Sequence, residues 1–232
     1  MRRLIACLMF LSVSAFLSVA TVAQDHDWQL YKAESGVRVE YRRKTANLLE
    51  IKAQTEVNAD TGAFIHLLED TGNIDKWVPN ADKAELLSHP DPATYIVHTF
   101  FKAPWPVSDR DMVTRSVWTT DEKSGELILD VQDLGDKYPD VAGYIRMQRV
   151  QARWTLTPQA DGKLLIRYQG QADPAGSLPN FIADKVALKS LFKTFKALPR
   201  VLQNYQQSHP AVADTTSTNP VPDQLRLRYY PG

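Results

Sequence analysis

The segment that decides how this chain folds is Ala103-Pro104-Trp105-Pro106-Val107-Ser108-Asp109-Arg110-Asp111-Met112-Val113. Pro104 and Pro106 fix two φ angles and bias the residues before them towards extended conformations. The segment therefore predicts a stiff connector between two β-strands. Arg110 and Asp111 open the second strand, where adjacent residues point to opposite faces. We interpret them as a structural ion pair or strand-end anchor that fixes the corner, with direct ligand contact as the alternative.

The beginning of the chain is typical of a cleavable secretory signal peptide. Met1-Arg2-Arg3 is a short basic region, residues 4–19 are mostly apolar, and Thr21-Val22-Ala23 offers small residues before a cleavage point at Gln24. An uncleaved anchor is the alternative, but the apolar stretch is short for a membrane span of roughly 20 residues. We expect residues 1–23 to be removed and the protein to be exported, most simply to a bacterial periplasm.

The composition of the 232 residues suits one domain with a substantial core, because 44% of them are hydrophobic. Basic and acidic residues are balanced at 27 each, so nucleic acid is not an expected partner. The only cysteine, Cys7, lies in the leader, so the mature chain would have no disulfide. Histidines with metal-ligand spacing, a nucleophile elbow and a Gly-rich phosphate loop are all absent from the sequence. We therefore expect no metal site and no catalytic residues.

Alternation of apolar and polar residues predicts a row of β-strands separated by short turns. A helix is expected from a cap at Asn58 or Asp60 to about Asp70, followed by an irregular element. A long helix is expected over 178–207, capped by Ser177 and weakened near Pro199. The predicted strands are 37–42, 49–57, 83–88, 95–101, 112–119, 126–134, 144–157 and 163–172.

The long helix carries a wide apolar face and an opposite basic stripe, so it must pack against another element. The fold class predicted is α+β, a curved antiparallel sheet wrapped around a long C-terminal helix. Residues 24–207 form this domain, and 208–232 form a flexible tail rich in Pro, Thr and Ser. The stripe consists of Lys185, Lys189, Lys193, Lys196 and Arg200.

Four segments together resemble the START family of lipid-transfer-related domains, in order and spacing over roughly residues 28–206. They are Pro104 to Asp111; Trp77; Pro139 with Gly143-Tyr144-Ile145-Arg146 and Trp154 to Pro158; and Asp173 to Pro179 before the last helix.

This resemblance implies a helix-grip fold with an apolar tunnel that holds one lipid or sterol-like ligand and no cofactor. In the sterol-binding branch of the family, a charged pair tends to lie inside the tunnel. The residues expected to face inwards after the connector are Met112, Thr114, Ser116 and Trp118, and none is charged, so the resemblance does not favour a sterol over an acyl lipid. The expected ligand contacts are Trp77, Met112, Thr114, Ser116, Trp118, Tyr168, Phe181, Leu188, Leu191, Phe192 and Phe195.

The function we predict is non-enzymatic binding, with or without transfer, of a lipid or other hydrophobic small molecule by a monomer. The basic stripe would support transient contact with a membrane surface. One alternative is a helix-grip enzyme, cyclase-like or hydrolase-like, acting in the same cavity; His98, Tyr95 and Tyr168 are the only candidate groups. A further alternative is a module that presents its tail and last helix to a protein partner.

Overall fold

The computed structural model describes residues 28–45, 47–103 and 105–206, and within them ten strands form one sheet. The strand order is β1-β2-β3-β10-β9-β7-β6-β5-β4, and neighbours along this path are antiparallel. The short β8 lies beside the start of β6 in parallel. The strands are β1 (Gln29–Glu34), β2 (Val37–Thr45), β3 (Leu48–Val57), β4 (Ala81–Asp91), β5 (Thr94–Phe101), β6 (Asp109–Thr120), β7 (Leu127–Asp133), β8 (Tyr144–Arg146), β9 (Gln148–Pro158) and β10 (Leu164–Asp173).

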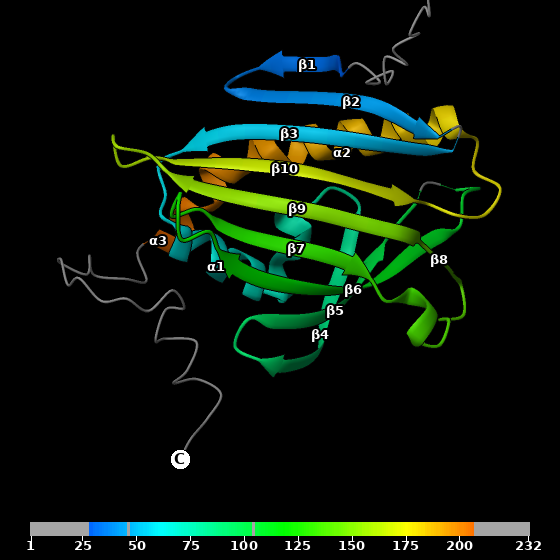
Figure 1. Ribbon diagram of the computed structural model, residues 1–232. Coiled ribbons are helices and arrows are strands. Elements are labelled where there is room, and N and C mark those ends of the chain that lie inside the picture. Colours follow the sequence, from blue (N-terminus) through cyan, green and yellow to red (C-terminus); the bar gives the residue numbers. More distant parts are fainter. Residues whose placement is uncertain (1–27, 46, 104, 207–232) are drawn as a thin grey trace, which may run out of the picture.

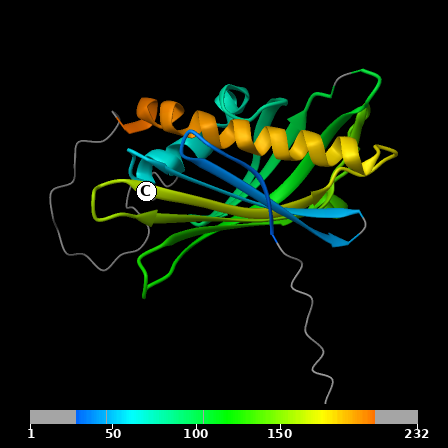
Figure 2. The same cartoon turned by 90° about the horizontal axis from the view of Figure 1, so that it is seen from above.

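The helices α1 (Thr61–Glu69), α2 (Asn180–Val201) and α3 (Gln203–Gln206) lie on one side of the curved sheet (Figures 1 and 2). We call the face towards α2 the inner face and the opposite one the outer face. This arrangement confirms the predicted fold class, a helix-grip fold in which the sheet wraps around the C-terminal helix. The helical elements are α1 (Thr61–Glu69), η1 (Thr71–Lys76), η2 (Gly135–Lys137), α2 (Asn180–Val201) and α3 (Gln203–Gln206).

The predicted start of the first helix is confirmed. Asp60 is the N-cap of α1, and its Oδ1 accepts a hydrogen bond of 2.7 Å from the backbone N–H of Ala63. Such a cap satisfies one of the donors that a helix N-terminus leaves free. Phe64 and Leu67 of α1 are then buried against the sheet and α2.

The stiff connector is also confirmed. β5 ends at Phe101, and β6 begins at Asp109, whose Oδ1 accepts a 2.8 Å hydrogen bond from the N–H of Ala103. Trp105 lies between them and is 92% exposed. Asp109 at the start of β6 therefore anchors the connector, and Trp105 points away from the core.

Three predictions about element boundaries are wrong. The strand expected over 144–157 is two strands, because the chain breaks at Met147, whose N–H donates to the carbonyl of Asp111 at 2.8 Å. The long helix begins at Asn180 with Pro179 as N-cap, so Ser177 is not its cap. The third concerns β1 (Gln29–Glu34), where no strand was predicted. The expected weakening near Pro199 agrees with the structure, because α2 ends at Val201 and the short α3 follows after Leu202. The predicted signal peptide (1–23) and the predicted tail (208–232) lie outside the described residues.

Candidate functional site

Strand alternation gathers most of the predicted contact residues on the inner face. Trp118 of β6 lies beside Leu129 of β7, which lies beside Trp154 of β9, which in turn lies beside Tyr168 of β10. Residues opposite one another in paired strands point to the same face. The even-numbered β6 residues therefore face inwards, as expected: Met112, Thr114, Ser116 and Trp118.

An aromatic cluster centred on Trp154 joins the sheet to both helices. The Trp154 ring is stacked on Phe195 of α2 at 5.6 Å between centroids and 3° between planes. It also contacts Phe64 of α1 at 5.4 Å and Tyr168 at 4.8 Å. Phe64 and Phe195 are fully buried. This cluster fixes the C-terminal half of α2 over β9 and β10.

The two halves of α2 differ in how far they are covered. In the middle and C-terminal part, Leu188, Phe192 and Phe195 are buried, and Leu191 is half-buried against the same core. In the first turns, Phe181 is 73% exposed. Phe181 therefore differs in exposure from the other predicted contacts on α2. The first turn of α2 lies at the same end of the molecule as the β5–β6 connector (Figures 1 and 2).

Tyr168 combines strong desolvation with residual accessibility. Burial raises the pKa of its phenol to about 12. Its side chain nevertheless remains only half-buried, and its hydroxyl makes no hydrogen bond with any described residue. The phenol lies over Gly170, where an added Cβ would meet the ring directly. The Tyr168 phenol is therefore strongly desolvated without being fully covered by the described residues.

Trp77 provides a second polar group within apolar surroundings. It follows η1, belongs to the core cluster and is 6% exposed. Its indole Nε1 is buried and has no hydrogen-bond partner among the described residues. An unsatisfied N–H of this kind carries a desolvation cost that an acceptor atom would remove.

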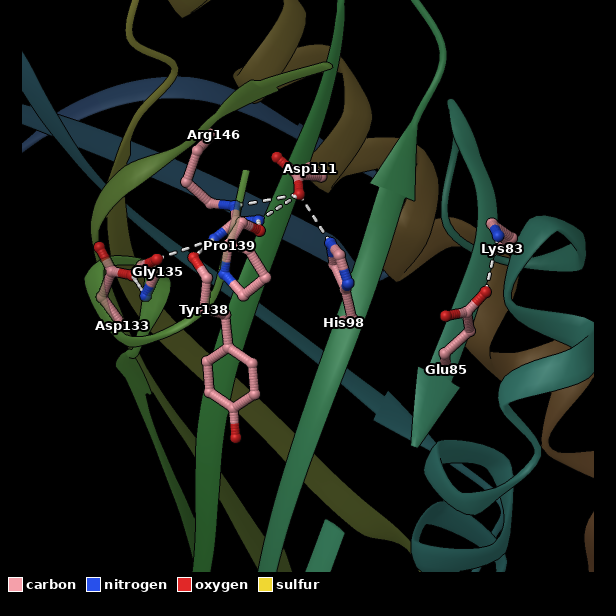
Figure 3. Close-up of polar contacts among 9 residues, drawn as sticks. All are labelled: Lys83, Glu85, His98, Asp111, Asp133, Gly135, Tyr138, Pro139 and Arg146. Carbon is pink, nitrogen blue, oxygen red and sulfur yellow. Dashed lines mark hydrogen bonds and ion pairs between the residues drawn. The ribbon is translucent and has the colours of Figure 1, made fainter. Parts of the chain in front are cut away.

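A buried charged cluster lies on the outer face of β5 and β6 (Figure 3). Asp111 is 1% exposed, and its Oδ2 lies 2.6 Å from His98 Nε2. Arg146 of β8 approaches the same oxygen with Nε at 3.0 Å and Nη2 at 2.8 Å. Desolvation alone would raise the pKa of Asp111, but the hydrogen bonds from Arg146 and His98 outweigh it and hold the pKa below its usual range. His98 therefore faces away from the inner face of the sheet.

Arg146 ties this cluster to the loop around η2. Its guanidinium donates to the carbonyls of Gly135 at 2.8 Å, Pro139 at 3.0 Å and Tyr138 at 3.3 Å. The loop is thus fastened to the sheet through Arg146 and Asp111 (Figure 3). Sequence reasoning missed this role, although Arg146 stood in one of the segments that resemble the START family.

Arg110 and Asp111 do not pair with each other. They lie on opposite faces, and the ion pairs of the described residues join Asp111 to Arg146 and His98 only. Arg110 faces inwards beside Ile145 of β8 and donates to the carbonyls of Ser108 and Pro174. The expectation that this strand turns no charged side chain inwards is therefore wrong, because β6 already begins at Asp109 and its inward parity includes Arg110. The prediction of a structural ion pair is wrong in its partner, because alternation places the two side chains apart.

Two open hollows lie on the outer face, with volumes of about 420 and 460 Å³. Polar and charged side chains line both, and Arg153 and Gln169 contribute to each. In the described part of the chain, no His, Cys, Asp and Glu side chains gather in threes as a metal site would need. None of the helices described is long and apolar enough to cross a membrane.

Comparison with known proteins identifies the family. The START domain model matches residues 14–208. The chain belongs to the START domain family. Among curated proteins, this START domain is 28% identical over 186 residues to an uncharacterized protein of Pseudomonas aeruginosa, covering 80% of this chain and 91% of that protein.

Two solved START structures support the fold. The STAR-related lipid transfer protein of Xanthomonas axonopodis (fragment 25–204) is 30% identical, with a TM-score of 0.69, and the match covers 76% of this chain and 98% of that one. Human STARD10 is 22% identical with a TM-score of 0.67, covering 78% of this chain and 76% of that one. At this lower identity, the likeness to STARD10 concerns the fold alone.

Proposed function

We propose that this START domain binds a lipid or other hydrophobic molecule between the inner face of the sheet and α2, without catalysing a reaction. The observation that carries the proposal is the Tyr168 phenol, which is strongly desolvated and yet only half-buried. Trp118 and Trp154 on the same face are likewise half-buried against the core cluster. Aromatic and aliphatic walls with a few polar groups are typical of small-molecule sites.

The inner face would supply enough binding energy for such a ligand. Burial of apolar surface contributes about 25 cal/mol per Å², so an acyl chain that buries about 300 Å² would gain roughly 7 kcal/mol. The Xanthomonas axonopodis neighbour is a STAR-related lipid transfer protein, which agrees with this ligand class. We expect Met112, Ser116, Trp118 and Leu191 to form part of the walls.

The enzymatic alternative finds little support in the positions of the candidate groups. His98 faces the outer side of the sheet and contacts Asp111 there. The hydroxyl of Tyr95 donates to Glu69 at 3.1 Å. A Tyr168 phenol with its pKa raised to about 12 is a poor proton donor near neutral pH. None of these three groups is therefore placed to act as a general base on a bound ligand.

The decisive experiment measures ligand loading of the mature protein. We would purify it gently, extract it for mass spectrometry and then offer it broad lipid panels. Ser116→Phe should fill the proposed site from the inner face and reduce loading, whereas Thr119→Phe on the exposed outer side of the same strand should not. Finding no co-purified lipid and no uptake from any panel would contradict the proposed function.

We further propose transient contact with a membrane surface at the end where α2 begins. Phe181, Ile182, Val186 and Trp105 are exposed there, and Lys185 continues the basic stripe. Exposed aromatic side chains next to cations favour an interface with anionic lipids. In a flotation assay with anionic vesicles, Phe181→Asp should reduce binding. Binding equal to that of the wild type would exclude this surface.

Export and a monomeric state complete the proposal. The leader segment motivates export, and recovery of a periplasmic protein beginning at Gln24 would support it. A cytoplasmic protein that retains its first 23 residues would contradict it. Sedimentation of the mature protein at one-chain mass would support the monomer.

A further inference from the structure

Arg110 is a buried cation on the ligand-facing side of the sheet. The residue is 7% exposed, and burial lowers the pKa of its guanidinium by more than the nearby Asp109 charge raises it. Its Nη1 donates to the carbonyl of Ser108, and its Nε reaches the carbonyl of Pro174 at 3.5 Å. Both partners are neutral, and no ion pair of the described residues includes Arg110. Its charge is thus left without a counter-charge in direct contact.

The other buried acids and bases of the described chain are compensated. Glu50 accepts from Arg42 Nε at 2.6 Å, and Asp111 accepts from Arg146. A buried charge without an opposite charge costs several kcal/mol, and folds rarely keep one that has no use. Arg110 differs from these residues because no opposite charge contacts its buried guanidinium, and this difference needs a physical reason.

One nitrogen of the guanidinium, Nη2, lies next to the loop that leads into α2. A Cβ at Gly176 would lie 3.9 Å from Arg110 Nη2 and only 3.0 Å from Ile145 Cδ1. A side chain at Gly176, whose φ is +67°, would therefore crowd the approach to this nitrogen. No hydrogen bond from Arg110 Nη2 to a described residue is formed. A guanidinium with free donors is well shaped for a carboxylate or a phosphate.

We propose that Arg110 binds the oxyanion, carboxylate or phosphate, of a ligand whose apolar chain lies along the inner face. This inference rests on the proposed lipid-binding function and names the class of ligand. The oxyanion would lie under the loop that leads into α2. Trp118 lies eight positions along β6 on the same face, about 27 Å away at 3.4 Å per residue. The chain of an anionic lipid would extend in that direction.

The test compares lipids that differ only in the anionic group. The mature full-length protein would be offered oleic acid and oleyl alcohol, and separately dioleoyl phosphatidic acid and dioleoylglycerol, from neutral carrier vesicles. Uptake is measured by mass spectrometry of the re-isolated protein. We expect the wild type to prefer the anionic member of a pair by about tenfold or more, since hydrogen bonds to charged groups are strong.

Arg110→Gln should bring this ratio close to one. Arg115→Gln is the matched control, because Arg115 is exposed on the outer face of the same strand, and its ratio should equal that of the wild type. Arg110→Lys keeps the charge and should retain part of the preference. Melting curves of each variant report whether it is folded.

Each result decides one question. A wild-type ratio near one, or an undiminished ratio in Arg110→Gln, overturns the proposal while the lipid-binding function stands. If Arg110→Gln does not fold, the ratios of the wild type and Arg110→Lys decide in the same way. Uptake of no lipid by any protein contradicts the proposed function itself. A melting shift with inorganic phosphate alone, lost in Arg110→Gln and without lipid preference, would assign a free anion to Arg110 and overturn the lipid assignment.

Discussion

Asp111→Asn is the substitution that tests the buried cluster most directly. Asparagine has nearly the shape of aspartate, so the change removes the charge with little effect on packing. It leaves the Arg146 guanidinium buried with carbonyl partners only, and it weakens the 2.6 Å contact with His98. The loop around η2 would then be fastened to the sheet only through a neutral side chain.

The expected loss is about 3–5 kcal/mol in the free energy of unfolding, the range observed when one partner of a buried ion pair is removed. For a domain of this size, each kcal/mol corresponds to about 2–4 °C in Tm, so Tm should fall by about 6–20 °C. Urea denaturation followed by circular dichroism measures the free energy, and calorimetry measures Tm. Asp111 and Arg146 are almost completely buried, so solvent screening should reduce this loss little.

Asp130→Asn provides the matched control. Asp130 also receives two hydrogen bonds from an arginine, Arg153, at 2.7 and 2.8 Å, but both side chains of this pair are exposed. Exposed pairs contribute about 1 kcal/mol or less. A loss for Asp111→Asn as small as that for Asp130→Asn would refute the reasoning. So would simple additivity with Arg146→Met, because two buried partners should show a coupling of about 1–3 kcal/mol.

The same cluster predicts a dependence of stability on pH. The folded pKa of Asp111 lies below its unfolded value, so the unfolded chain binds the proton more readily. The contribution of Asp111 is therefore complete above the unfolded pKa of about 3.9 and is lost as pH falls through the lower folded pKa. Asp111→Asn should flatten the decline of the unfolding free energy below about pH 4. An unchanged acid limb would contradict the assigned pKa direction.

Three further substitutions probe the inner face, each measured by urea denaturation. Phe195→Ala removes the fully buried ring stacked on Trp154 and should cost about 3–5 kcal/mol; a loss below about 1 kcal/mol would contradict this packing of α2. Gly170→Ala places a methyl group against the Tyr168 phenol and should cost about 1–3 kcal/mol, so a neutral result would show that the ring moves freely. Tyr168→Phe removes a hydroxyl without a partner among the described residues and should change stability by less than about 0.5 kcal/mol; a larger loss would reveal a missed hydrogen bond.

Local signals were sufficient for much of the fold. Alternation of residue types located most of the strands, with β1 missed and β8 and β9 predicted as one, and Asp60 located the start of α1. The parity of β6 was predicted correctly, because Trp118 and Met112 lie an even number of residues apart and share a face. Ligand contact by these residues stays a prediction, since parity assigns a face and does not show what occupies it.

The cluster around Asp111 could not be read from the sequence, because three separate strands supply its members. His98 is placed on the outer face only by the register of β5 against β6, which sets it opposite Val113. Arg146 reaches Asp111 only because the three residues of β8 pair with β6 in parallel. A strand so short leaves no periodic pattern, and such pairings depend on contacts distant in the sequence.

The adjacent residues Arg110 and Asp111 serve two different purposes because a strand alternates its faces. Asp111 is turned towards two basic partners and holds the η2 loop to the sheet. Arg110 is turned towards the ligand side, where its described hydrogen-bond partners are neutral carbonyls. Substitution of Asp111 should therefore change stability, with lipid selectivity retained in the molecules that remain folded. Substitution of Arg110 should change selectivity with a smaller loss of stability. If both variants lost stability and selectivity together, the dipeptide would act as a single structural anchor.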